Sequence, residues 1–119
     1  MRDKTEIFKA IAEPNRVRIL LMLLKKPLCV CEITSILKLK TATVSSHLSI
    51  LRQAGFVTDE KDGKWINYKI NLNSNDIMIN MLLENLSLWF SEEEKIIDDN
   101  NKVQSVDRYS IICNGKEIK

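Results

Sequence analysis

The sequence predicts a mostly helical α+β fold, a winged helix-turn-helix with a β-hairpin wing and a terminal dimerisation helix. Apolar residues recur at helical spacing through residues 5–54, with breaks near two prolines. β-forming residues flank an Asp-Gly turn in residues 56–70, and a helical apolar pattern returns in residues 75–100. With 119 residues, 45% hydrophobic and 29% charged, the chain has the size and composition of one globular domain.

Two helices open the chain. Apolar side chains at helical spacing predict a first helix over residues 5–12. Proline is favoured in the first turn of a helix and breaks its interior, so a second helix begins near Pro14 and ends before Pro27.

The next two helices are short and closely joined. Residues 30–37 place Ile33 and Ile36 on one face, which predicts a helix of about two turns. Residues 41–54 carry a second apolar stripe, and Gly55 follows at the position where glycine ends helices. Two short helices joined by a brief turn form a helix-turn-helix.

Residues 56–70 favour strands. Val57, Trp65 and Tyr68 are β-forming residues, and the segment "DEKDGK" at 59–64 contains the Asp-Gly turn signal. A hairpin directly after a helix-turn-helix is a wing.

The last apolar segment predicts a dimer. A helix over residues 75–100 would carry more apolar surface than one small domain can bury, so we expect it to pack on a second copy in a homodimer. Residues 101–119 are polar apart from "YSII". We therefore expect one winged-helix and dimerisation domain over residues 1–100, and a flexible tail or short appended element over 101–119.

Charge and hydropathy exclude some locations and partners. The first ten residues carry charges and no apolar signal core, and the longest apolar run, Ile19–Leu24, is far below the ~20 residues of a membrane span. We expect a cytoplasmic protein without membrane contact. A net charge of +2 does not indicate nucleic-acid binding by itself, so that prediction rests on where the basic residues lie.

The second helix of the pair has a polar face that suits double-stranded operator DNA. A helix in the major groove needs short polar side chains near bases and phosphates, with basic residues at its edges. A lone histidine fits a DNA contact better than a metal site, which needs several ligands. The predicted DNA-facing residues are Lys40, Thr41, Thr43, Ser45, Ser46, His47 and Arg52, together with Lys61 and Lys64 of a basic wing.

Two cysteines begin the first helix of the pair. Cys29 takes the N-cap position, Cys31 follows two residues later, and Glu32 stands where a glutamate completes a capping box. Cysteine caps helices poorly, so helix stability does not explain this choice. Three cysteines in a cytoplasmic chain favour metal binding or redox sensing over a disulfide framework.

The spacing of the cysteines predicts a coupling to DNA. Side chains two positions apart on an intact helix point about 200° apart, whereas extended backbone puts them on one face. Binding one ion through both sulfurs should therefore unwind the first turn of this helix and move the helix behind it. Ligand and DNA would then oppose each other through conformation, as in a repressor that its ligand releases.

The choice of ligand follows from sulfur chemistry. The helix N-terminus, Lys25 and Lys26 should favour the thiolate form that binds metals. Sulfur ligands argue against nickel, cobalt and magnesium, and zinc prefers four ligands. Two or three thiolates fit As(III) or Sb(III) as inducer, with Cd(II), Pb(II) and Cu(I) as competitors.

Several segments together resemble the arsenical-resistance (ArsR/SmtB) family of winged-helix repressors. They are "FKAIAEPNRVRILLML", "LCVCEI", "TATVSSHLSILRQAGFV" and "DGKWINYKI". The resemblance implies a homodimeric repressor that leaves its operator when inducer binds. It also implies that Cys29 and Cys31 are the inducer-binding pair, and that Ser45, Ser46 and His47 lie on the recognition helix.

The sequence departs from the family at the third sulfur. The arsenic-type motif often has a third cysteine three residues after the pair, where this chain has Thr34. Cys113 is the only candidate for a third ligand. The absence of cysteine before Cys29 and of histidine in residues 75–100 departs from the cadmium, zinc and nickel types and favours As(III) or Sb(III).

Three alternatives remain open. The same fold could sense a thiol redox or persulfide signal, with Cys113 as resolving partner because a disulfide between Cys29 and Cys31 would be strained. A thiol enzyme would need a CxxC motif or a nucleophile loop in an α/β domain, and neither is present. A winged helix that binds only proteins would not need the polar recognition face.

Overall fold

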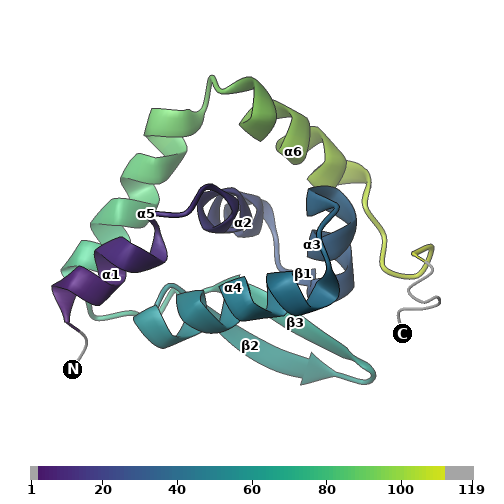
Figure 1. Cartoon of the computed structure of the whole chain (residues 1–119), viewed down its shortest axis with the longest axis horizontal. Helices are drawn as coiled ribbons and strands as arrows, with labels where there is room; N and C mark the ends of the chain where they lie inside the picture. The colour runs from purple at the N-terminus through teal and green to yellow at the C-terminus, as the bar shows by residue number, and fades with distance from the viewer. Residues whose placement is uncertain (1–2, 112–119) are drawn as a thin grey trace.

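A computed structural model describes residues 3–111 of the chain. Helix α2 lies at the centre, α5 and α6 form an arch on one side of it, and α4 lies with the hairpin on the other (Figure 1). The elements in chain order are α1 (Lys4–Ala10), α2 (Pro14–Lys25), β1 (Leu28–Cys29), α3 (Val30–Leu37), α4 (Thr41–Ala54), β2 (Val57–Asp62), β3 (Trp65–Ile70), α5 (Ile77–Phe90) and α6 (Glu94–Ser105). This arrangement confirms the predicted winged helix-turn-helix.

The helix-turn-helix is formed by α3 and α4. Helix α3 ends at Leu37, and its C-cap, Lys38, adopts a left-handed backbone conformation (φ 58°). Lys40 follows two residues later as the N-cap of α4. Gly55 ends α4 with φ 100°, a conformation that glycine adopts without strain. The chain therefore turns sharply at both ends of α4, which sets the direction of the hairpin.

The wing is an antiparallel hairpin of β2 and β3, turned at Gly63 with φ 61°. A third strand, β1, pairs with the other edge of β3, and Cys29 stands opposite Asn67. The sheet order is therefore β1-β3-β2. The sequence did not predict β1, because two residues are too few to show an alternating pattern.

The core surrounds α2. Ile19, Leu20 and Met22 of this helix have no exposed surface, and neither do Leu48 of α4 and Phe56. Helix α2 contacts α4, α5, α6 and β3, so it is the scaffold that joins the helix-turn-helix to the C-terminal helices.

The expected single helix over residues 75–100 is two helices, so this prediction is wrong. Helix α5 ends at Phe90, and α6 begins after Glu93 and continues past residue 100 to Ser105. The break turns the chain so that apolar residues of both helices are buried, which one straight helix could not achieve. The first helix is also shorter than expected and ends at Ala10.

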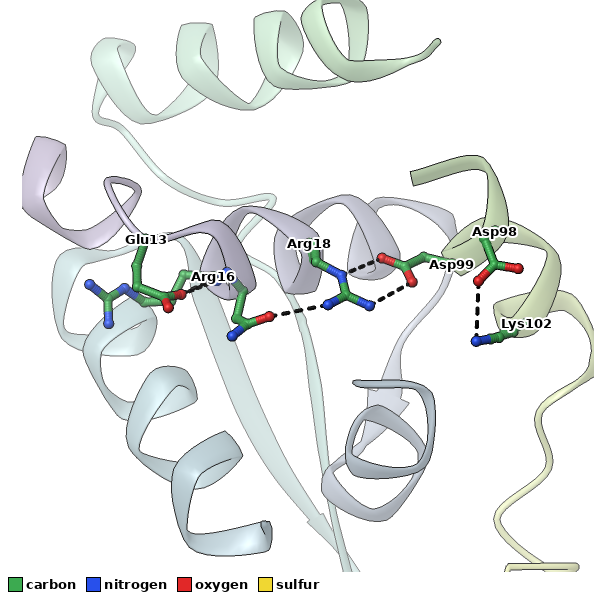
Figure 2. A network of polar contacts seen from close by, with 7 residues as sticks. Glu13, Arg16, Arg18, Asp98, Asp99 and Lys102 are labelled. Carbon is green, nitrogen blue, oxygen red and sulfur yellow. Dashed lines mark hydrogen bonds and ion pairs between the residues drawn. The ribbon is translucent and has the colours of Figure 1, made fainter. Parts of the chain in front are cut away.

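An ion pair attaches α6 to α2. Arg18 donates from Nε and Nη2 to the two carboxylate oxygens of Asp99 at 2.8 and 3.0 Å (Figure 2). The Asp99 side chain is only 2% exposed, so its charge depends on this two-point contact. Asp98, one residue earlier, pairs instead with Lys102 at the surface.

No helix in residues 3–111 is long and apolar enough to cross a membrane.

Candidate functional site

Helix α4 presents the predicted polar face to solvent. Three of its apolar residues, Val44, Leu48 and Leu51, are buried against the body of the protein. The predicted DNA-facing residues that are exposed on or beside α4 are Lys40, Thr41, Thr43, Ser46 and Arg52, and Ser45 is half-buried. Short hydroxyl side chains at this surface allow the backbone of another molecule to approach closely.

His47 does not project freely from this face. Arg16 of α2 donates from Nη1 to its Nδ1 at 3.2 Å, and its Nε2 lies 3.9 Å from Glu13 Oε1. The side chain is 13% exposed. The histidine that we expect to face DNA is therefore largely covered in the free protein, because the start of α2 packs against this position of α4 and provides polar partners for the imidazole.

Glu13 and Arg16, the two partners of His47, also form the start of α2. Glu13 is the N-cap, and its Oε1 accepts hydrogen bonds from the backbone N–H groups of Asn15 and Arg16 at 2.7 and 3.1 Å. Arg16 also donates from Nε to the carbonyl oxygen of Ala10 at 2.6 Å, beyond the end of the short first helix. Glu13 and Arg16 therefore position α1, α2 and His47 together.

The wing is less basic than expected. Lys61 and Lys64 are exposed, as predicted. Asp59, Glu60 and Asp62 lie in the same hairpin, however, so its three carboxylates balance its three lysines, the third of which is Lys69. Arg52 of α4 pairs with Asp59 at 2.9 Å, which ties the recognition helix to the wing and offsets one of these charges.

The two cysteines lie side by side. Cys29 Sγ and Cys31 Sγ are 2.8 Å apart, well above the 2.03–2.05 Å of a disulfide, so no disulfide joins them. The expectation that an intact helix holds these sulfurs on opposite sides is wrong for this pair. Cys29 is the N-cap and its backbone is extended (φ −86°, ψ 165°), so its side chain does not follow the helical rotation.

Glu32 completes the predicted capping box. The backbone N–H of Cys29 donates a hydrogen bond to Glu32 Oε1 at 2.9 Å, and the Cys29 side chain accepts one from the backbone N–H of Glu32. Cys29 has no exposed surface, Glu32 is buried, and Cys31 is partly exposed. Of the two cysteines, Cys31 is therefore the one that solvent reaches.

Burial keeps Cys29 protonated. Desolvation and the hydrogen bond with Cys31 raise the pKa of the Cys29 thiol well above its usual range, and the negative charge of Glu32 adds to this effect. The expectation that the helix N-terminus and nearby lysines favour thiolate is therefore wrong for Cys29. The local charge and the loss of water outweigh the helix dipole.

Two further observations concern a third ligand. Thr34 Oγ is buried in α3 without a hydrogen-bond partner, three residues after Cys31 and thus on the same side of the helix. Within residues 3–111, no group of three or more Cys, His, Asp or Glu side chains is placed to hold a metal ion. Cys113 lies outside the described residues.

Sequence patterns did not predict one cluster of contacts near the wing. Arg108 lies over the Trp65 ring, 4.1 Å from its centroid, and pairs with Asp62 at 2.6 Å. It also donates to Asn67 Oδ1 at 3.0 Å, and Tyr109 packs edge-on against Trp65. The polar composition after residue 101 gave no signal of this contact, which joins segments about 40 residues apart.

Comparison with known proteins agrees with this architecture. Residues 13–59 match the family model described as bacterial regulatory protein, arsR family. The arsenical resistance operon repressor of Escherichia coli is 32% identical over 92 residues, which cover 76% of each chain. The chain belongs to the ArsR family. Because the family and these relatives are transcriptional regulators, the prediction that the chain is not an enzyme is confirmed.

Other relatives in the family carry different names. The arsenic resistance transcriptional regulator ArsR1 of Pseudomonas putida is 38% identical over 66 residues, and a cadmium resistance regulatory protein CadC homolog of Staphylococcus aureus is 37% identical over 70. These matches cover 55% and 58% of the chain but only 52% and 58% of those relatives. The chain therefore matches little more than half the length of either relative.

A solved structure confirms the fold of this ArsR-family chain. HlyU from Vibrio cholerae superimposes with a TM-score of 0.64 at 29% identity, covering 75% of this chain and 92% of HlyU.

Proposed function

We propose that this ArsR-family chain is a cytoplasmic homodimeric repressor of a metalloid-resistance operon. Helix α4 and the wing bind double-stranded operator DNA, and As(III) or Sb(III) releases the protein by binding Cys29 and Cys31. The observation that carries the proposal is the position of the two sulfurs, 2.8 Å apart at the start of the first helix of the helix-turn-helix. Relatives named for arsenical resistance support the choice of ligand.

DNA binding is assigned to the exposed face of α4. Thr41, Thr43 and Ser46 supply short hydroxyl groups for bases and phosphates, with Ser45 at the edge of this face. Lys40 and Arg52 contact the flanking phosphates, and Lys61 and Lys64 do so from the wing. His47 has a different role here, because its contacts with Arg16 and Glu13 fix the angle of α4 against α2.

Dimerisation is assigned to the outer face of α5. Ile77, Met81 and Leu88 follow one another at helical spacing and are 72%, 55% and 72% exposed, and Trp89 beside them is 60% exposed. Ile77 and Met81 also line a hollow of about 830 Å³ between α2, α5 and α6. An exposed apolar stripe of this length is costly in water, so a second copy covers it.

The sulfur pair fits a small thiophilic ion after a limited movement. Sulfurs that share one ion at about 2.3 Å each, with a near-tetrahedral angle, lie about 3.7 Å apart. Cys29 and Cys31 must therefore separate by about 1 Å from their present 2.8 Å. Movement of Cys29 disturbs both its hydrogen bond to Glu32 and its pairing with Asn67, so inducer binding acts on α3 and on the wing together.

The protonation of Cys29 favours a trivalent metalloid hydroxide. A divalent cation that binds both sulfurs must release two thiol protons into solvent, and a raised thiol pKa opposes that release. With a neutral hydroxide of As(III) or Sb(III), each thiol instead gives its proton to a departing hydroxide, which leaves as water. No proton is then released into solvent, so the raised pKa of Cys29 opposes As(III) or Sb(III) less than Cd(II) or Pb(II).

A second candidate function has the same fold and the same DNA-binding surface but responds to a different inducing signal. Two thiols in contact are also placed for oxidation, or for a persulfide signal. The resemblance to a cadmium-resistance regulator keeps Cd(II) and Pb(II) among the alternatives. Titration of each ion under reducing conditions separates metalloid sensing from Cd(II) or Pb(II) sensing and from oxidation of the thiols.

The experiment is release of labelled DNA from the region upstream of the gene, followed by fluorescence anisotropy under reducing conditions. Arsenite, antimonite, cadmium, lead and zinc are titrated against wild type, Cys29→Ser, Cys31→Ser and Cys113→Ser. We expect release by arsenite and antimonite, and loss of this response in Cys29→Ser and Cys31→Ser with DNA binding retained. Cys113→Ser decides whether the site uses two sulfurs or three. DNA binding without release by any of these ions would overturn the metalloid assignment.

A further inference from the structure

Residues after α6 contact the wing through an ion pair, a hydrogen bond and contacts with an aromatic ring. We name the contact of Arg108 and Tyr109 with Asp62, Trp65 and Asn67 the clasp. Arg108 donates to Asp62 at 2.6 Å and to Asn67 at 3.0 Å while its guanidinium lies over the Trp65 ring. A hydrogen-bonded ion pair and a cation–π contact hold one side chain in one orientation.

The clasp covers one face of the hairpin. Asp62 stands opposite Trp65 in the ladder and Asn67 opposite Glu60, so Asp62, Trp65 and Asn67 share a face. Asp59 pairs with Tyr68 on the other face, where Arg52 of α4 reaches it. One arginine therefore holds each face of the wing, one from the recognition helix and one from the C-terminal segment.

The charges show why the wing needs both arginines. Around the turn, in residues 59–64, Asp59, Glu60 and Asp62 outnumber Lys61 and Lys64, and a net negative wing tip would repel DNA phosphates. Asp62 flanks the turn at Gly63, close to where a wing meets the backbone of DNA. The guanidinium of Arg108 lowers the pKa of Asp62, which favours the ionised carboxylate in this contact.

The clasp is also anchored to the body of the protein. It follows directly from α6, whose Asp99 is bound to Arg18 of α2, and Figure 1 shows the chain leaving α6 on the side of α3. Asn67, which Arg108 contacts, is the strand partner of Cys29. The clasp thus connects α6, the wing and the strand that carries the first cysteine.

We propose that Arg108 is a positioning residue for DNA binding, which offsets the charge of Asp62 and orients the wing toward the DNA backbone without contacting the DNA itself. This inference rests on the proposed function, since it assumes that the wing meets DNA. It gives Arg108, which lies outside the helix-turn-helix, a role in DNA binding that the helix-turn-helix motif does not predict.

The test compares DNA affinity in a double-mutant cycle of the full chain, with Arg108→Ala, Asp62→Asn and both together. Arg108→Ala should weaken binding about three- to tenfold at moderate salt, because it leaves the charge of Asp62 facing phosphate. Adding Asp62→Asn should restore most of the affinity. Arg108→Lys keeps the charge but loses the two-point contact, so it should lie between wild type and Arg108→Ala.

A matched control removes a cation of the same region. Lys102→Ala breaks a surface pair with Asp98 on α6, away from the wing, and should leave the affinity unchanged. Thermal unfolding of every variant separates a loss of binding from a loss of folding. Equal affinity of Arg108→Ala and wild type would overturn the proposal, and so would a loss that Asp62→Asn does not restore, which would indicate a direct phosphate contact. Absence of DNA binding by wild type would instead overturn the proposed function and this inference with it.

Discussion

Cys29, the N-cap of α3, pairs across the sheet with Asn67 of the wing strand β3. The side chain of Asn67 in turn contacts Arg108 and Asp62. A displacement of Cys29 therefore has a direct route to the wing, as well as the route through α3 to α4. The proposed release of DNA uses two connections that begin at the same residue.

Replacement of Thr34 by cysteine should make the protein more sensitive to metalloid. Thr34 Oγ is buried without a hydrogen-bond partner and lies one helical turn after Cys31. A sulfur there adds a third thiol for a trivalent ion, so Thr34→Cys should release DNA at a lower arsenite concentration than wild type. Thr34→Val, which has the same shape without a ligand atom, should respond at the wild-type concentration. Titration of both variants by fluorescence anisotropy checks this, and equal midpoints would contradict it.

Loss of Asp99 should destabilise the fold far more than loss of its neighbour Asp98. Asp99→Ala leaves the largely buried Arg18 without its partner and should lower the free energy of unfolding by about 2–4 kcal/mol. Asp98→Ala breaks only an exposed pair with Lys102 and should cost about 0.5 kcal/mol or less. Urea unfolding measured by circular dichroism compares the two. A similar loss for both variants would show that the arch of α5 and α6 does not depend on this ion pair.

Stability should fall in alkaline solution because of Cys29. Burial and the contact with Cys31 raise the pKa of this thiol in the folded protein above the ~8.5 of an unfolded chain. The folded state therefore binds the proton more tightly, and the stabilisation is complete below about pH 8.5 and decreases as the pH rises further.

Urea unfolding at a series of pH values from 7 to 11 measures this effect. Cys29→Ser should be less stable than wild type at pH 7, and the difference should narrow above about pH 8.5 by at most ~1.4 kcal/mol per pH unit. Tyr68, whose pKa burial also raises, contributes a similar alkaline loss in both proteins and cancels in the comparison. A difference that stays constant with pH would show that the thiol titrates alike in both states.

A charge in the α5 stripe should separate the proposed dimer. Leu88 is 72% exposed in the chain, so Leu88→Glu should leave the fold intact but place a carboxylate in the covered interface. Ile97→Glu on α6, at a partly exposed apolar position outside the stripe, is the matched control. Sedimentation velocity should show monomers for Leu88→Glu and dimers for wild type and Ile97→Glu. Dimers in all three would place the interface elsewhere.

Local sequence patterns were sufficient to predict the helix-turn-helix and the wing. Apolar spacing, Pro14 and Gly55 mark the ends of α2 and α4 through forces that act within a few residues. The Asp-Gly turn and alternating β-formers likewise mark β2 and β3. Local patterns did not predict the break between α5 and α6. This break depends on burying both helices against α2 and on the ion pair between Arg18 and Asp99, which are 81 residues apart in the sequence.

The fold class, the family motifs and the cysteines at the helix start could be read from the amino-acid sequence, because periodicity, capping and turn chemistry are local properties. How those residues meet depends on the packing of distant segments. Extended backbone at Cys29 brings it against Cys31, burial raises its pKa, and packing of α2 turns His47 inward. The contact of Arg108 with Trp65 joins distant segments through charge and an aromatic face. Such contacts leave no local pattern, because their energy depends on the three-dimensional position of both partners.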